Sequence, residues 1–180
     1  MRAILAAFLL ASGAALAPAE TFDLGKYGKL DLYPVGEWKI QVEDVGDLKV
    51  TFTPKVAGVN AVAQMTIAAG GADDFPTRDK LQAQLITVGE RMIAAGQFVE
   101  SEPKLKTFYP KQGFGAYYLL TDPRLVGKDP VPGDFKTVMF GLIRANEKIM
   151  IRVQIMSDGE TTEGFQQLAG MIEGMELTAK

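Results

Sequence analysis

The chain has 180 residues, 47% of them hydrophobic, and its 19 Lys and Arg against 22 Asp and Glu leave a net charge of -3. This composition predicts an ordered core, and the mildly negative balance offers no electrostatic footprint for nucleic acid or an anionic membrane surface. His and Cys are both absent, which excludes a Ser-His-Asp triad, a cysteine nucleophile, disulfides and the usual zinc, copper or haem sites.

The first residues have the layout of a secretory signal peptide. Arg2 provides a short positive segment, Ala3 to Leu16 is apolar, and small residues surround Pro18. The apolar run is shorter than the roughly 20 residues that a membrane-crossing helix needs. Because Pro18 disfavours an earlier cut, we expect cleavage after Ala19 and a mature chain from Glu20. The sequence therefore predicts a signal peptide over residues 1–19, one domain over residues 20–180, and a periplasmic or secreted location.

The next part of the chain has the two-residue periodicity of β-strands. Trp38, Ile40 and Val42 alternate with polar residues, which predicts a strand with these three side chains on its buried face. The alternation resumes after a turn around Gly46, so the two segments are expected to form a hairpin. The strands expected here are Thr21 to Leu24, Leu30 to Tyr33, Trp38 to Glu43, Leu48 to Phe52 and Ala61 to Ala69.

The period then changes to that of a helix. Leu81, Leu85, Val88 and Met92 recur at helical spacing and predict a helix from near Pro76 to Gly96. A second helix is expected after Ser157-Asp158-Gly159-Glu160, which has the spacing of a capping box with Ser157 as the cap, and it should end near Gly174. The remaining expected strands are Lys104 to Tyr109, Phe114 to Thr121, Phe135 to Arg144, Ile149 to Met156 and Met175 to Thr178.

Two of these strands, Phe114 to Thr121 and Phe135 to Arg144, are apolar on both faces. That pattern is typical of central strands in a sheet covered on both sides. With one helix in mid-chain and one at the end, the sequence predicts an α+β fold in which an antiparallel sheet has a helix packed on each face.

The order of these pieces resembles the PsbP-like superfamily. The resemblance rests on turn residues and on the succession of elements: Pro34-Val35-Gly36-Glu37-Trp38, Val50 to Pro54, Asn60-Ala61-Val62, the hairpin across Asn146, and the closing helix with Phe165 to Ile172. The family includes the extrinsic photosystem subunit PsbP, a Ran-binding nuclear import factor and small exported bacterial proteins. The resemblance implies an α/β/α sandwich that acts by binding partners rather than by catalysis.

Carboxylates are the remaining acid-base groups, and none forms a recognisable site. Glu100 and Glu102 flank a turn, but a glycosidase needs two carboxyls held across a sugar cleft, which spacing in sequence does not show. Asp122, Asp129 and Asp134 lack the spacing of a calcium-binding EF-hand loop, and no phosphate-binding glycine motif occurs. We therefore expect no catalytic, metal or cofactor site. A small-ligand carrier or a carboxylate-based enzyme is the alternative.

The segment from Asp122 to Asp134 is the longest irregular stretch, because its prolines and glycines oppose a regular element. It presents a charged rim around an apolar pair, as a partner-binding patch would. Tyr109, beside Pro110, is the aromatic residue most expected at the surface. The predicted partner-binding residues are Arg124, Leu125, Val126, Lys128 and Tyr109. We expect a non-enzymatic binding or accessory protein, with a protein partner in the cell envelope, no nucleic acid and no transmembrane anchor after signal cleavage. A tolerated insertion without function is an open alternative for the loop.

Overall fold

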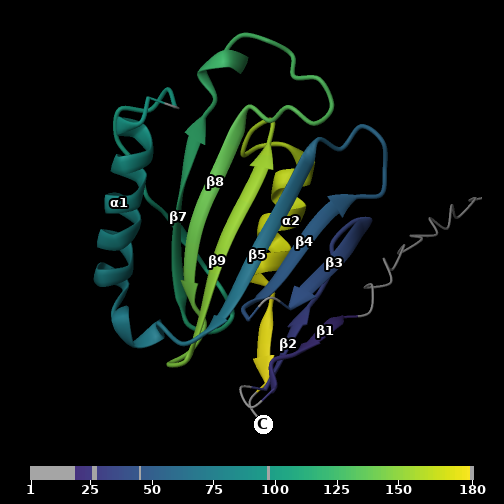
Figure 1. Ribbon diagram of the computed structural model, residues 1–180. Helices are drawn as coiled ribbons and strands as arrows, with labels where there is room; N and C mark the ends of the chain where they lie inside the picture. Colours follow the sequence, from purple (N-terminus) through teal and green to yellow (C-terminus); the bar gives the residue numbers. More distant parts are fainter. Residues whose placement is uncertain (1–18, 26–27, 45, 97, 179–180) are drawn as a thin grey trace, which may run out of the picture.

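A computed structural model describes residues 19–25, 28–44, 46–96 and 98–178 (Figure 1). Apart from Ala19, the predicted signal peptide lies outside the described residues. The helices are α1 (Arg78–Ala94) and α2 (Glu163–Glu173), with short 3-10 turns η2 (Ala72–Asp74) and η3 (Pro123–Leu125). The strands are β1 (Glu20–Asp23), β2 (Lys29–Leu32), β3 (Trp38–Asp44), β4 (Leu48–Pro54), β5 (Ala61–Ala69), β6 (Lys106–Phe108), β7 (Phe114–Thr121), β8 (Thr137–Arg144), β9 (Ile149–Ser157) and β10 (Glu176–Thr178).

The strands form two antiparallel sheets. The larger has the order β3-β4-β5-β9-β8-β7-β6, and the smaller has the order β1-β2-β10. The two predicted hairpins, β3 with β4 and β8 with β9, are confirmed. In the second hairpin Asn146 Oδ1 accepts hydrogen bonds from the backbone N–H groups of Lys148, at 2.8 Å, and Ile149, at 2.9 Å, which fixes the turn. The fold is therefore α+β and antiparallel, as predicted, although the strands form two sheets where one was expected.

Side-chain alternation along the strands divides the core into two clusters on opposite faces of the large sheet. On one face, Ile151 and Ile155 of β9 pack with Phe165 of α2 and with the small sheet. On the other face, Tyr118 of β7 packs with Leu85 of α1. Each helix thus covers one face; in Figure 1 α1 lies at the left beside β7, and α2 lies behind the strands of the large sheet.

The path of the chain explains why α1 covers only one side of the sheet face on which it lies. After β5 the chain crosses β9, β8 and β7 and enters the sheet again at the far edge as β6, and α1 lies within that crossing. The helix contacts β7 and β8. Among the described residues, no helix therefore covers the α1-side face of β9 and β5.

The cap predicted for the second helix is wrong. β9 continues through Ser157, which pairs with Ala61 of β5 and Thr137 of β8. The Ser157 side chain is fully buried and its Oγ lies 3.2 Å from Thr137 Oγ1. The cap is Thr162, whose Oγ1 accepts from Phe165 N at 3.4 Å. Pairing on both sides of β9 stabilises an extended Ser157 more than a local Ser-x-x-Glu pattern stabilises a helix start.

Two expectations about buried faces also need correction. Trp38 is buried and Ile40 is half-buried, but Val42 is 47% exposed because it lies towards the far end of an edge strand. The two strands that are apolar on both faces are β8 and β7, and only the three-residue β6 lies outside β7. Their apolar faces reflect the position of α1 rather than the middle of the sheet, which is β9.

Candidate functional site

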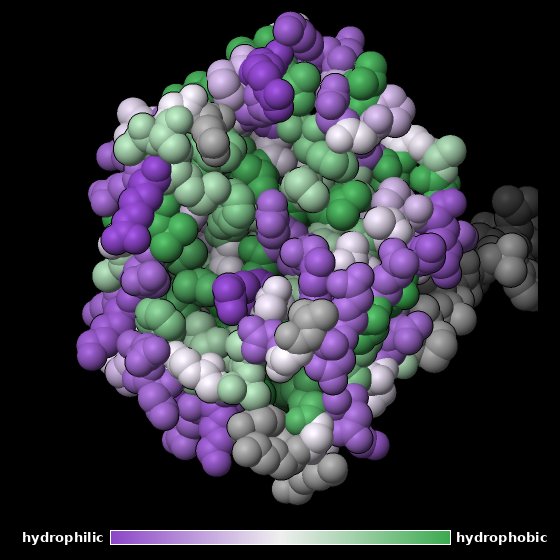
Figure 2. Space-filling model, in the orientation of Figure 1, coloured by the Kyte–Doolittle hydropathy of each residue, from purple (hydrophilic) through white to green (hydrophobic). Residues whose placement is uncertain are grey.

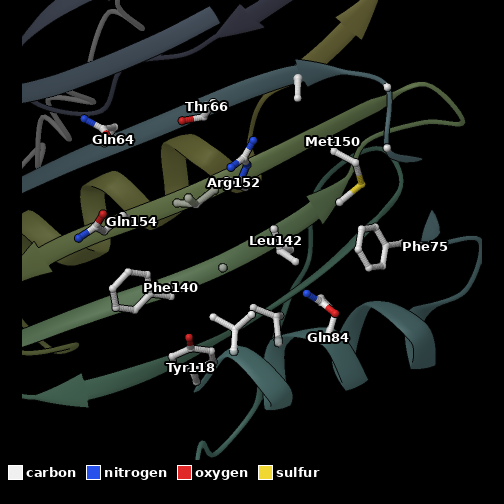
Figure 3. A pocket seen from close by; sticks show the side chains of 17 residues that line it. Gln64, Thr66, Phe75, Gln84, Tyr118, Phe140, Leu142, Met150, Arg152 and Gln154 are labelled. Atoms are coloured by element: carbon white, nitrogen blue, oxygen red, sulfur yellow. The ribbon is translucent and has the colours of Figure 1, made fainter. Parts of the chain in front are cut away.

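The uncovered half of the α1-side face forms a groove beside the helix. Its volume is about 550 Å³, within the range of small-molecule sites. Figure 3 shows side chains from β5, β9, β8 and β7 facing those of α1 across it. The lining residues are Gln64, Thr66, Ala68, Gly70, Gly71, Phe75, Gln84, Leu85, Val88, Tyr118, Phe140, Gly141, Leu142, Met150, Arg152, Val153 and Gln154.

The groove changes from apolar to polar across the strands. Directly opposite one another in the ladder stand Tyr118 of β7, Phe140 of β8, Gln154 of β9 and Gln64 of β5. This row covers three strand spacings, or about 14 Å. In the orientation of Figure 1, Figure 2 shows hydrophobic residues gathered between α1 and the middle of the sheet, with hydrophilic residues at the border. Apart from Gln84 of α1 and the buried Tyr118, the hydrogen-bonding groups therefore lie at the open side, and the apolar wall lies at the helix.

The apolar end of the groove is built on rigid aromatic packing. The Tyr118 and Phe140 rings are tilted with their centroids 5.9 Å apart, an arrangement that aromatic pairs prefer. The Tyr118 hydroxyl lies 3.5 Å from Met92 Sδ, and burial raises the pKa of Tyr118 to about 12. Tyr118 is therefore a neutral packing residue at physiological pH rather than an acid or base.

One cationic side chain borders the groove. Arg152 stands between Thr66 of β5 and Leu142 of β8. Its Nη2 lies 3.3 Å from Asp47 Oδ2, and the two side chains are 64% and 40% exposed. An exposed pair of this kind contributes about 0–1 kcal/mol, so the guanidinium can exchange Asp47 for another anion at small cost.

The predicted partner-binding residues do not form one surface. Arg124, Leu125, Val126 and Lys128 follow the end of β7, whereas Tyr109 follows β6, beside the start of β7. The eight residues of β7 separate the two sites by about 24 Å. Tyr109 is 76% exposed and Val126 is 57% exposed, while Leu125 is half-buried.

The loop after β7 is tied to the body of the protein. Asn60 Nδ2 donates to the Asp134 carbonyl at 2.7 Å, and Asn60 Oδ1 accepts from Gly133 N at 3.2 Å. At its start, Asp122 accepts from Arg124 Nε at 3.0 Å and from Arg124 N at 2.8 Å. These bonds hold the pKa of Asp122 at about 2. The guanidinium of Arg124 is therefore already paired within the loop.

Glu100, one of the two carboxylates weighed for catalysis, and Glu160 both have structural partners. Glu100 accepts from Thr121 N at 2.8 Å and from Thr121 Oγ1 at 2.7 Å, which holds the end of β7. Glu160 accepts from Tyr117 Oη at 3.0 Å and from Lys106 Nζ. Across residues 19–25, 28–44, 46–96 and 98–178 no group of three acidic side chains is placed to hold a metal ion.

The groove residues escaped the sequence-based interpretation. Arg152 and Gln154 interrupt an otherwise apolar strand at alternate positions, and Gln64 and Thr66 do the same in Ala61 to Ala69. This alternation indicates one uncovered face on each strand, and it was the available signal. That the two strands are neighbours, with a helix beside them, could not be deduced from it.

No protein-family model matches the chain, and no curated protein or solved structure matches it either. No helix in the part of the chain that the structure describes is long and apolar enough to cross a membrane.

Proposed function

We propose that this chain is an exported, non-enzymatic binding protein that holds its ligand in the groove beside α1. The observation that carries the proposal is an apolar wall of helix and sheet side chains that opens to solvent where α1 leaves β9 and β5 uncovered. The polar groups around it are amides, hydroxyls and one guanidinium. Such groups orient a ligand through hydrogen bonds.

The export part of the proposal rests on the N-terminal sequence. A short positive segment, an apolar run and small residues before Glu20 support a cleaved signal and a periplasmic or secreted location. The intact mass of the protein recovered from the cell envelope tests this, and a mass that includes the first 19 residues contradicts it. The resemblance to PsbP-like proteins stays a prediction, and its implication of action by binding agrees with the proposal.

A protein partner at the loop after β7 is a second candidate. The loop presents Val126, 57% exposed, and Val131, 62% exposed. Asn60 anchors it, so these side chains are displayed on a fixed backbone. The predicted residues Arg124, Leu125 and Lys128 lie on the same segment, and Tyr109 does not.

An uncharged fluorescent probe tests the groove. Nile red should bind the folded protein with a saturable rise in fluorescence, and Val88→Gln should weaken it about fivefold. Val88 lines the groove and is half-buried, so a polar replacement removes roughly 1 kcal/mol of apolar contact. Gln has a higher helix propensity than Val, so the helix itself is not weakened.

Ile86→Gln is the matched control. Ile86 lies on the same helix, is 37% exposed and does not line the groove, so its replacement should leave Nile red affinity unchanged. Equal losses in the two variants, or no saturable binding to the wild-type protein, contradict the proposed site.

A further inference from the structure

The two ends of the groove have different chemistry. At the helix end the wall is formed by Phe75, Leu85, Val88, Leu142 and Met150. These side chains provide no hydrogen-bonding group and suit a hydrocarbon segment, and the exposed Gln84 of α1 is the polar side chain at this end. Figure 3 shows Phe75, Leu142 and Met150 grouped at this end beside α1.

The outer end provides hydrogen-bond donors around one positive charge. Gln64, Thr66, Gln154 and Arg152 occupy paired positions on the adjacent strands β5 and β9. Among the described residues that line the groove, Arg152 is the one charged side chain. The local charge therefore complements an anion, and the amides and hydroxyl can complete its hydrogen bonds.

Asp47 is the competitor for that anion. It pairs with Arg152 at 3.3 Å, at a solvent-exposed position outside the groove lining. Exposed pairs are held weakly, so a ligand anion desolvated by the groove can displace Asp47 from the guanidinium. Removing the Asp47 charge should then strengthen binding.

We propose that the ligand is a free single-chain amphiphile with an anionic head, its hydrocarbon chain beside α1 and its head at Arg152. This inference rests on the proposed function and specifies the ligand of the same groove. The apolar wall adjoins the cationic rim directly on β9, where Met150 and Arg152 lie two residues apart on one face. One molecule can therefore contact both, and a volume of about 550 Å³ suits a single ligand.

Displacement of Nile red by two twelve-carbon amphiphiles tests the proposal. Dodecanoate and dodecyltrimethylammonium have equal chains and opposite charges, and both are used below the concentration at which they form micelles. We expect dodecanoate to bind about tenfold more tightly, because a hydrogen bond to a charged group adds about that factor. The preference should decrease as salt is added.

Variants of the charged residues identify the head-binding group. Arg152→Gln should abolish the preference for dodecanoate, and Arg152→Lys should restore part of it. Asp47→Asn should raise dodecanoate affinity about two- to fivefold. Lys29→Gln is the control for Arg152→Gln, because it also removes one positive charge. Lys29 lies on β2, in the small sheet on the α2 side, so its replacement should have no effect.

The outcomes distinguish a wrong ligand from a wrong binding site. Equal displacement by the two amphiphiles, or an unchanged preference in Arg152→Gln, overturns the anionic head while Nile red binding upholds the groove. Failure of both amphiphiles to displace bound Nile red overturns the single-chain ligand alone. Co-sedimentation with anionic phospholipid vesicles, without displacement of Nile red by dodecanoate, overturns the free amphiphile and indicates that the protein binds a membrane surface. Absence of Nile red binding removes the proposed function and the inference with it.

Discussion

Gly164 marks a close approach of α2 to the sheet. It lies in the first turn of the helix and is buried against β5. A Cβ added to Gly164 would lie 2.8 Å from Ala61 Cβ and 3.0 Å from Val59 Cγ1. Ala61 is paired with Ser157 in the sheet, so its Cβ cannot move without moving the strand.

Gly170 provides the matched position on the same helix. It is exposed, and nothing lies within 4 Å of an added Cβ. Ala is favoured over Gly in a helix by about 1 kcal/mol, and both substitutions gain this term. The Gly164→Ala variant also carries the cost of overpacking, typically about 1–3 kcal/mol. We therefore expect Gly170→Ala to be stabilised by up to about 1 kcal/mol and Gly164→Ala to be less stable than it by about 1–3 kcal/mol.

Urea denaturation of the two variants and the parent measures this difference. The slopes should agree, because the surface exposed on unfolding is nearly the same, so the midpoints report stability directly. In thermal melts each 1 kcal/mol corresponds to roughly 2–4 °C for a domain of this size. If Gly164→Ala proves as stable as Gly170→Ala, α2 does not pack against β5 as closely as described, and the reasoning fails.

Three further predictions follow from buried or anchored side chains. Trp38 is 5% exposed and donates from Nε1 to the Val35 carbonyl at 2.9 Å, so its fluorescence should resist iodide quenching and Trp38→Ala should cost about 3–5 kcal/mol in urea denaturation; free quenching in the folded state contradicts this. Because the folded pKa of Tyr118 is raised from 10.0 to about 12, its contribution to stability is complete below pH 10 and is lost as pH rises to about 12. Phenolate absorbance near pH 10 should therefore show the same number of ionising tyrosines in the wild-type protein and in Tyr118→Phe, whereas an exposed Tyr118 would give the wild-type protein one more. Asn60→Ala removes the anchor of the loop after β7, so limited proteolysis between 123 and 133 should accelerate while Nile red affinity is unchanged; equal cleavage rates exclude the anchoring role.

The groove requires contacts between distant parts of the chain, which local sequence patterns do not specify. Alternation in β9 and β5 indicates that Arg152 and Gln64 lie on a polar face, and it predicts nothing about which strands are adjacent. The row that brings Gln64 and Gln154 together forms because β5 and β9, far apart in the chain, pair in one register. A shift of one residue would send these side chains to the opposite face.

The same dependence on distant contacts explains the corrected expectations. Ser157 matches a capping box by spacing, but pairing with Ala61 and Thr137 extends the strand through it. Tyr109 and Val126 both lie in surface segments, as their neighbours predict, yet they lie at opposite ends of β7. Tyr109 follows β6, which pairs with the start of β7, and Val126 follows the end of β7.

Residue periodicity alone established the α+β class, the two helices with their buried faces, the hairpins and the two strands with apolar side chains on both faces. These features are local, because side-chain direction repeats every two residues in a strand and every 3.6 in a helix. Pairing between distant strands decided the sheet order, and the crossing from β5 to the β6 edge placed α1 over β7 and β8. The candidate site belongs to this second group, because its polar side and its apolar wall come from segments that meet only when the large sheet is complete.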